Sequence, residues 1–348
     1  MDQERELLVQ LQELHAKLAK VRAGDRTARL SGSQLVGPGA ASTDGGADGG
    51  ASGGGGGAAG QSNRCPRFLS EGQKLIVCCA QKPVRMTRTH QGDAWAYRSS
   101  QSGFKSAIDW VGTGNRVQWV SWPGAAVEQA TQDAVRKRVQ AEHATSPVFI
   151  SRELQAQVEG FWAHTLWPNL HCSPADFEGH PNQEKFQSEY DGYAYFNQLF
   201  VERVMELYSE GDLVMVYDYE LMLLPALLRR RLPQVPIGFF FHCPFPSSEL
   251  FQELPVRSEL LHGVLGADLI AFNHFDYVRH FQNSCTRILG LEKNPTFELG
   301  RHGSFEYEGR LIALEIMPAG IDLGKFSLES DQHAESITAA ESHADATQ

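Results

Sequence analysis

The strongest constraint on the fold comes from the stretch 236–241, "PIGFFF", in which a run of apolar residues follows a proline. A short apolar run between prolines is typical of a strand that is covered on both faces, as in the middle of a parallel sheet. The next residues, "HCPFP", contain two prolines that neither a central strand nor a helix accommodates. We therefore expect the strand to end at Phe241, with His242 at its carboxyl end.

Similar strand-like segments alternate with helix-like segments along most of the chain. Strands are predicted over residues 74–80, 116–122, 213–220, 236–241 and 268–272, and within 310–322. Helices are predicted over residues 126–143, 188–210, 223–234, 247–255, 258–267 and 275–290. This alternation predicts an α/β fold with a Rossmann-like, doubly wound and mainly parallel sheet, whose ligands bind at the carboxyl ends of the strands.

The N-terminal residues 1–24 form a short charged helix in this interpretation. Five aliphatic residues follow a heptad-like spacing on one face of it: Leu7, Leu11, Leu14, Leu18 and Val21. Such a seam is typical of a coiled coil, but it is shorter than the roughly three to four heptads that a coiled coil needs, which favours a solitary helix with frayed ends. If the chain self-associates or contacts a partner protein, residues 1–24 are the predicted place.

Three other segments follow from composition. Residues 25–65 contain "GADGGASGGGGGAAG" and are predicted to be a disordered, glycine-rich linker. Residues 66–326 contain all the predicted strands and form the expected globular domain. Residues 327–348 are polar, have almost no large aliphatic side chains and are predicted to be a disordered tail.

Charge and cysteine usage narrow the class of protein. The 348-residue chain has 31 basic and 42 acidic side chains, a net charge of −11 and no basic stripe, which argues against nucleic acid and anionic membranes as partners. The acidic start "MDQERELLVQ" does not resemble a signal peptide, and no apolar run reaches the roughly 18 residues of a membrane helix. The six cysteines lack C-x-x-C and zinc-ligand spacing. A cytoplasmic protein with reduced thiols and no metal is expected.

Two polar residues stand at the ends of neighbouring predicted strands, Asp218 after "VMVY" and His242 after "GFFF". A carboxylate accepts several hydrogen bonds, and each imidazole nitrogen donates or accepts one, so together they can bind sugar hydroxyls. The alternative is that Asp218 is a turn or capping residue and His242 a core histidine with satisfied hydrogen bonds.

Predicted loops contribute further candidates. Trp122 in "WVSWPG" and Trp167 in "TLWPNLH" stand beside prolines, where an indole can stack on a sugar face; the alternative for each is a place in the core. Gly103 in "SQSGFKSA" would let the backbone approach a phosphate. No dinucleotide fingerprint, Walker motif or nucleophile elbow accompanies these residues.

The segment Val216–Leu291, which begins "VYDYELMLLPALLRRR", resembles the trehalose-6-phosphate synthase family, the twentieth glycosyltransferase family, and is most similar to its plant type. Weaker similarity in "KLIVCCAQKPV", "LWPNLH" and "YDGYAYFNQLF" extends the resemblance over residues 75–326. It implies the N-terminal half of a GT-B glycosyltransferase of trehalose biosynthesis. It also implies transfer of glucose from UDP-glucose to glucose 6-phosphate, with retention of configuration and without metal or cofactor.

The resemblance assigns roles to individual residues. Asp218 matches the family's acceptor-sugar aspartate, and Trp167 matches its acceptor-site tryptophan. His242 matches the histidine that contacts the donor glucose, and Gly103 matches part of a glycine pair that faces the donor phosphates. Gln81 stands where the family has an arginine on the acceptor phosphate.

Two departures from the family pattern concern the acceptor. Gln81 replaces a cation by a neutral amide, for which Lys82 or Arg85 could substitute. Val158 stands where the family has an acceptor-site tyrosine and has no hydroxyl. Because a charge-assisted hydrogen bond contributes about 1.5–3 kcal/mol, we expect weakened acceptor binding.

The chain ends soon after "MPAGIDLGKF", where the family crosses into its second domain. That domain supplies the cations on the donor pyrophosphate, and each missing donor of this kind costs about 3–4 kcal/mol. The chain alone is therefore expected to be nearly inert. Three interpretations follow: the acceptor-side domain of a synthase, a non-catalytic sugar-phosphate sensor or regulatory subunit of a synthase complex, or a chain truncated from a longer gene.

Overall fold

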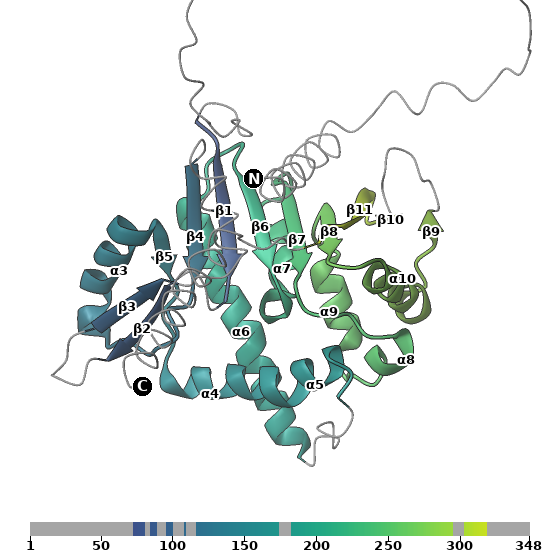
Figure 1. The fold of residues 1–348 in the computed structure, drawn as a ribbon, viewed down its shortest axis with the longest axis horizontal. Helices are drawn as coiled ribbons and strands as arrows, with labels where there is room; N and C mark the ends of the chain where they lie inside the picture. The colour runs from purple at the N-terminus through teal and green to yellow at the C-terminus, as the bar shows by residue number, and fades with distance from the viewer. Residues whose placement is uncertain are drawn as a thin grey trace, which may run out of the picture.

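The computed structural model describes residues 72–80, 84–88, 95–99, 108, 116–173, 182–294 and 303–318. The predicted helix 1–24, linker 25–65 and tail 327–348 lie outside these residues. A sheet of nine strands runs through the described part in the order β5-β4-β1-β6-β7-β8-β11-β10-β9 (Figure 1).

The strands from β5 to β11 in this order are parallel to one another. They are β5 (Thr145–Pro147), β4 (Arg116–Ser121), β1 (Lys74–Cys79), β6 (Leu213–Tyr217), β7 (Ile237–Phe241), β8 (Leu269–Phe272) and β11 (Arg310–Ile316). Beyond them lie the antiparallel strands β10 (Ser304–Tyr307) and β9 (Lys293–Asn294). A separate antiparallel hairpin consists of β2 (Val84–Arg88) and β3 (Trp95–Ser99). The predicted α/β fold with a mainly parallel sheet is confirmed, whereas the hairpin, β5, β9 and β10 were not predicted.

Most helices occupy their predicted segments. They are α3 (Gln129–His143), α4 (Arg152–Phe161), α5 (Trp167–Leu170), α6 (Gln183–Leu207), α7 (Leu224–Arg231), α8 (Ser248–Phe251), α9 (Arg257–Val264) and α10 (Phe275–Leu289). A π-helix, Trp162–Leu166, joins α4 to α5, and none of these three elements was predicted. The helix predicted over 247–255 is the single turn α8, which ends at Phe251, four residues before Pro255.

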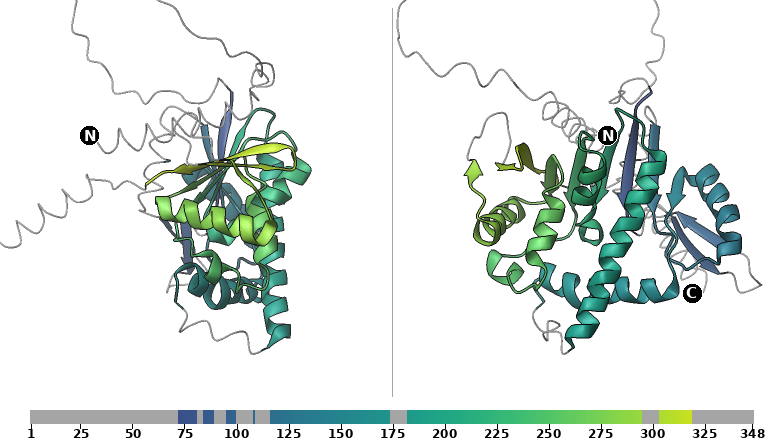
Figure 2. Two further views of the ribbon diagram at one scale, coloured as in Figure 1. Left: turned by 90° about the vertical axis from the view of Figure 1, so that its right-hand side faces the viewer. Right: turned by 180° about the vertical axis from the view of Figure 1, so that it is seen from behind.

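The two faces of the sheet carry separate apolar clusters. Ile76 and Cys78 of β1 belong to the larger cluster, whereas Val77 and Cys79 belong to the smaller one, as the alternation of a strand requires. Side chains of α4, α6, α7, α9 and α10 complete the larger cluster, and Figure 2 shows α6 running along the sheet when the molecule is seen from behind. Among the described residues outside the strands, Ile108 is buried in the smaller cluster and Met317 packs partly buried against it.

Helix α6 presents the apolar face that its sequence predicts. Phe196, Phe200 and Val204 are fully buried, and Leu199 and Leu207 pack partly buried against the same cluster. The helix ends at Leu207, four residues before the Gly211 expected to end it. The apolar stripe therefore fixes which side of α6 faces the sheet.

Helices α4 and α6 cross closely because each has a glycine opposite a long polar side chain of the other. A Cβ added to Gly160 of α4 would lie 2.5 Å from Oε1 of Glu189 on α6. A Cβ added to Gly192 of α6 would lie 2.5 Å from Cβ of Gln157 on α4. The Gln157 amide also donates to the Ser188 hydroxyl at 2.9 Å. This crossing holds α4, and the chain that continues into α5, below the carboxyl ends of the strands (Figure 1).

The Gly192→Ala variant is expected to lower the free energy of unfolding by about 1–2 kcal/mol. Overpacking costs about 1–3 kcal/mol, and a Cβ only 2.5 Å from Cβ of Gln157 places the cost in the upper part of this range, above the roughly 1 kcal/mol that alanine gains over glycine in a helix. Urea unfolding measures the difference. Adding Gln157→Gly to this variant should recover part of the loss, since it removes the clashing Cβ. A Gly192→Ala variant as stable as the natural chain would contradict the close crossing.

Candidate functional site

Three consecutive strands end in polar residues that are hydrogen-bonded to one another. Asp218 follows β6, His242 follows β7 and Asn273 comes directly after β8. The carboxylate Oδ1 of Asp218 accepts from the backbone N–H of His242 at 3.2 Å. The side-chain amide of Asn273 donates to the backbone oxygen of His242 at 2.7 Å. The structure therefore brings Asp218 and His242 together, at the edge where the sequence placed them.

The Asp218 carboxylate serves the ends of two strands at once. Its Oδ1 accepts from the backbone N–H groups of Tyr219 at 3.1 Å and of His242 and Cys243 at 3.2 Å. The side chain is almost buried, with 9% of the residue exposed. Because a buried donor without a partner costs about 1–3 kcal/mol, this carboxylate holds the chain after β7 in place. The capping role considered for Asp218 is thus part of what it does.

The backbone of Asp218 has a conformation that residues with a side chain rarely adopt. Its φ of 71° and ψ of 176° fall in a region occupied almost only by glycine. Such a conformation costs on the order of 1–3 kcal/mol and concentrates at functional sites, where surrounding contacts impose it. The Asp218 N–H donates to the Phe240 carbonyl at 2.9 Å and helps to impose it. The turn also explains why β6 stops at Tyr217 and not at the predicted Glu220.

The imidazole of His242 is exposed at the end of β7. Its ring lies beside the Tyr217 ring, with centroids 5.8 Å apart and planes 29° apart, and the Phe240 ring is 6.4 Å away. Within the described part of the chain, neither ring nitrogen of His242 has a hydrogen-bond partner. The alternative of a core histidine is therefore wrong, and both nitrogens are available to a ligand.

Trp167 is the first residue of α5, which corrects its predicted place in a loop. The indole is 50% exposed. The His171 ring stacks on it with centroids 3.6 Å apart, and the Tyr219 ring lies 6.2 Å away. His171 Nδ1 lies 3.0 Å from the Trp167 carbonyl oxygen, to which it can donate. One indole face is thus covered by His171, while half of the residue surface stays accessible beside the residue that follows Asp218.

Trp122 lies in the core, where it is 1% exposed. Its ring centroid is 6.3 Å from those of Trp162 and Phe196. The prediction that Trp122 stacks on a sugar is wrong, because no face of the ring is open to a ligand. The strand alternation continues one residue beyond β4, so Val120 and Trp122 both point into the larger cluster.

The remaining predicted positions contribute little to this edge. Gln81, Lys82 and Gly103 lie outside the described residues. Val158 is fully buried in α4, so the position matched to the acceptor-site tyrosine is a core position here. Arg85 is exposed on β2, in the hairpin that is separate from the main sheet.

The groups around Asp218 keep their protons. Burial, followed by the charges of Asp218 and Glu220, raises the pKa of Tyr217 far above its usual range, and burial does the same for Tyr219. Burial and then the Asp218 charge also raise the pKa of Cys243. A neutral thiol is a poor nucleophile. The surroundings therefore suit hydrogen bonding to a polar ligand and not attack by a thiolate.

Metal-binding clusters and membrane-spanning helices are both absent from the described ranges. Within them, no group of three or more His, Cys, Asp or Glu side chains could hold a metal ion. None of the helices found there combines the length and apolar character of a membrane crossing. The cysteines that lie there are not in disulfide bonds: Cys78, Cys79, Cys172, Cys243 and Cys285.

Sequence reasoning missed two residues of this edge. Asn273 follows the buried strand "LIAF" just as His242 follows "GFFF", so the same pattern would have identified it. His171 stands four residues after Trp167, a spacing that brings side chains together on a helix. It was missed because "LWPNLH" was interpreted as a loop.

The Asp218→Ala variant is expected to lower the free energy of unfolding by about 2–3 kcal/mol, because backbone donors lose their acceptor. Asp218→Gly loses the same acceptor but removes the backbone strain, so it should be about 1 kcal/mol more stable than Asp218→Ala. Urea unfolding of both variants gives the comparison. If the glycine variant is the less stable of the two, the proposed strain at Asp218 is absent.

Two buried tyrosines, Tyr193 and Tyr217, and two half-buried ones, Tyr190 and Tyr219, are expected to ionise only when the chain unfolds. Burial raises the pKa of Tyr190 to about 12 and raises those of Tyr193, Tyr217 and Tyr219 further above their usual range. A pKa that is higher in the folded state stabilises the fold fully below about pH 10, and this stabilisation is lost as the pH rises through the folded values. Stability should fall above that pH, and phenolate absorbance of these four should appear together with loss of circular dichroism. Their ionisation with the dichroism unchanged would show that they are not buried.

Known proteins match most of the chain. Residues 73–341 match the model of glycosyltransferase family 20. The UDP-forming alpha,alpha-trehalose-phosphate synthase 1 of Aspergillus niger is 38% identical over 267 residues, which cover 75% of this chain and 48% of the relative. Synthase 1 of Arabidopsis thaliana is 37% identical over 262 residues, which cover 73% of this chain and 26% of the relative. These two identities do not separate a plant type from a fungal one.

Among solved structures, the N-terminal domain of Candida albicans trehalose-6-phosphate phosphatase matches with a TM-score of 0.61 and 29% identity. The match covers 75% of this chain and 51% of that one. The chain thus spans about half, or less, of the length of the proteins it matches. Since the matched region 73–341 is well over half of the 348 residues, the chain belongs to glycosyltransferase family 20.

Proposed function

We propose that this chain forms the acceptor-side half of a UDP-forming trehalose-phosphate synthase, which transfers glucose from UDP-glucose to glucose 6-phosphate with retention of configuration. Family membership and the names of the matched synthases support this reaction over a non-catalytic sensor. The observation that carries the proposal is the hydrogen-bonded row of Asp218, His242 and Asn273. It lies at the carboxyl ends of parallel strands, where α/β proteins bind their ligands.

Each residue of this edge has a role in the proposal. The Asp218 carboxylate, oriented by backbone donors, accepts a hydrogen bond from a hydroxyl of the acceptor sugar. The accessible part of the Trp167 indole packs against the same sugar. His242 directs an imidazole nitrogen toward a hydroxyl of the donor glucose. Because Asp218 and His242 are adjacent, the two sugars would meet above β6 and β7, which lowers the entropic part of the barrier.

The negative charge that develops on the departing UDP needs to be stabilised by cations. The described residues at the strand ends do not supply them, because Asp218, His242, Asn273 and Trp167 carry no permanent positive charge. Preorganised donors at such a position contribute about 3–4 kcal/mol each. In this proposal the chain binds the acceptor sugar, and turnover by the chain alone is slow. We also place it in the cytoplasm, where thiols such as those of Cys243 and Cys285 stay reduced.

Acceptor binding can be followed at Trp167 in a chain labelled with 5-fluorotryptophan. Its six tryptophans give separate fluorine resonances, which single Trp→Phe variants assign. Glucose 6-phosphate should shift the Trp167 resonance saturably, and Asp218→Asn should weaken this response about 10- to 100-fold, because a charged acceptor is replaced by a neutral one.

The matched control is Asp133→Asn, an exposed aspartate on α3 that pairs with Arg136. It should leave the Trp167 response unchanged. In the same preparation, UDP release from UDP-glucose should be slow, depend on glucose 6-phosphate and disappear in His242→Ala but not in His262→Ala, an exposed histidine on α9. A Trp167 resonance that does not respond to glucose 6-phosphate would contradict the acceptor role.

A further inference from the structure

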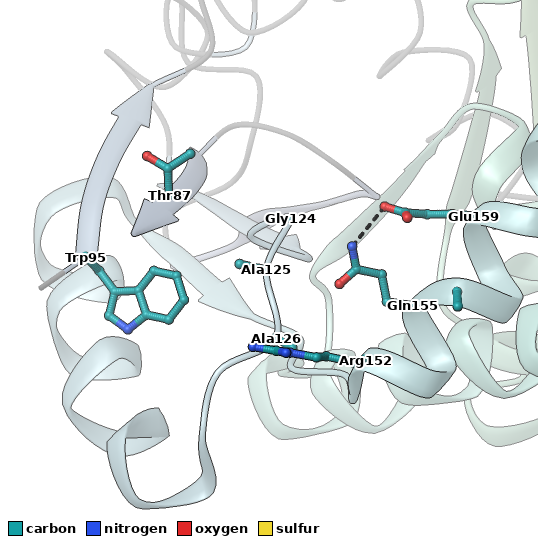
Figure 3. A pocket seen from close by; sticks show the side chains of 9 residues that line it. Thr87, Trp95, Gly124, Ala125, Ala126, Arg152, Gln155 and Glu159 are labelled. Atoms are coloured by element: carbon teal, nitrogen blue, oxygen red, sulfur yellow. Dashed lines mark hydrogen bonds between the residues drawn. The ribbon is translucent and has the colours of Figure 1, made fainter. Parts of the chain in front are cut away.

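A cavity of about 470 Å³ that is open to the surface lies between the hairpin β2–β3, the segment 124–126 after β4 and helix α4 (Figure 3). Its volume falls within the roughly 300–1,000 Å³ of small-molecule sites. Asp218, His242 and Trp167 are not among the residues that line it. The cavity is therefore built from other parts of the chain than the strand-end site.

One wall of the cavity is the indole of Trp95 on β3. The ring is half-buried and packs against the small apolar cluster that the hairpin shares with α3, which includes Met86, Val135 and Val139. This packing orders the indole, and Figure 3 shows the Trp95 ring at the edge of the cavity. An ordered aromatic ring of this kind is a platform for the apolar face of a sugar.

The opposite wall is the polar face of α4. Arg152, Gln155 and Glu159 follow one another at spacings of three and four residues and line the cavity together. The other face of the same helix, with Leu154 and Val158, is buried in the core. The orientation of α4 therefore has one physical cause, the burial of its apolar stripe, and the polar residues face the cavity as a consequence.

Two groups on this wall form a hydrogen bond with each other, and the third, Arg152, does not take part in it. The Gln155 amide donates to Oε1 of Glu159 at 3.1 Å, which leaves amide and carboxylate atoms side by side for further hydrogen bonds. Arg152 is exposed, and within the described residues it has no hydrogen bond or ion pair. Figure 3 shows its side chain lying along the floor of the cavity near Ala126. The Arg152 charge acts on the neighbouring Glu153 carboxylate, but the two form no ion pair, so the guanidinium can still bind an anion in a forked geometry.

These groups select the ligand. An indole opposite an amide–carboxylate pair suits a sugar ring with neighbouring hydroxyls, and the guanidinium suits a phosphate. The carboxylate of Glu159 disfavours a ligand that consists of negative charge alone. From this arrangement we propose that the cavity between Trp95 and α4 is a second binding site, for a phosphorylated sugar, separate from the strand-end site.

The fluorotryptophan-labelled chain tests this second site in the same titration, because Trp95 and Trp167 report on different places. Glucose 6-phosphate should shift the Trp95 resonance saturably. Arg152→Gln should weaken that response about 10- to 100-fold, as expected for a lost charge-assisted phosphate contact. The Trp167 response should stay unchanged in this variant, because Arg152 does not belong to the strand-end site.

The matched control is Arg231→Gln, an exposed arginine at the end of α7 that pairs with Glu202. It should change neither response, and the other tryptophan resonances verify that each variant is folded. Gln155→Ala gives a second test on the same wall and should weaken the Trp95 response several-fold. Inorganic phosphate and glucose, titrated singly, should each bind more weakly than the sugar phosphate.

Three outcomes would overturn the proposal of a second site, and a fourth would separate it from the function proposed for the strand-end site. A Trp95 resonance that does not respond to glucose 6-phosphate would exclude the site, whatever Trp167 does. A Trp95 shift that inorganic phosphate reproduces in full would exclude recognition of the sugar. A response unchanged by Arg152→Gln would exclude the guanidinium as the phosphate ligand. Loss of the Trp167 response with the Trp95 response retained would reject the acceptor role proposed for the strand-end site while supporting the second site.

Discussion

The hydrogen bonds that the Asp218 carboxylate accepts from backbone groups at two strand ends are the interaction on which the site depends. The central strands are buried along their whole length, so their side chains offer a ligand nothing but apolar surface. Polar side chains reach a ligand only where the strands end. At the same place the backbone N–H groups of the turns need a hydrogen-bond acceptor. A ligand that uses this carboxylate has to share it with the backbone, so ligand binding and the order of the turn after β7 are coupled.

The α4–α6 crossing fixes where α4 and α5 lie relative to the carboxyl ends of the strands. Gly160 and Gly192 allow the two helices to approach, and Glu189 and Gln157 fill the space that the missing side chains leave. The chain leaves α4 through a π-helix, a turn that is frequent at functional sites, and then places Trp167 at the start of α5. Helix α4 thus has two roles. The chain that follows its carboxyl end places Trp167 at the strand ends, and its polar face lines a separate cavity.

The sequence predicted the centre of the sheet better than its periphery. Strands β6, β7 and β8 are nearly continuous apolar runs between turn residues, and the residues that follow them were identified as a site because strand ends are where polar groups gather. The hairpin strands "VRMTR" and "WAYRS" carry no such run, since they cover a small cluster on one side only. Trp122 was misplaced because a proline two residues from the end of a strand was taken as evidence of an exposed loop. The cavity beside α4 depends on contacts between distant segments, which no local pattern encodes.

The position of β1 has a consequence for how the domain folds. It is the first strand of the described part, yet it lies between β4 and β6, and the Lys74 backbone pairs with Asp212, 138 residues further along the chain. By contrast, β6, β7 and β8 are sequential neighbours joined by short helical connections. Contacts between close segments form sooner than contacts that close long loops. During synthesis, β1 can pair with β4 well before β6 exists, but the edge of β1 that faces β6 stays open until more than half of the domain has been made.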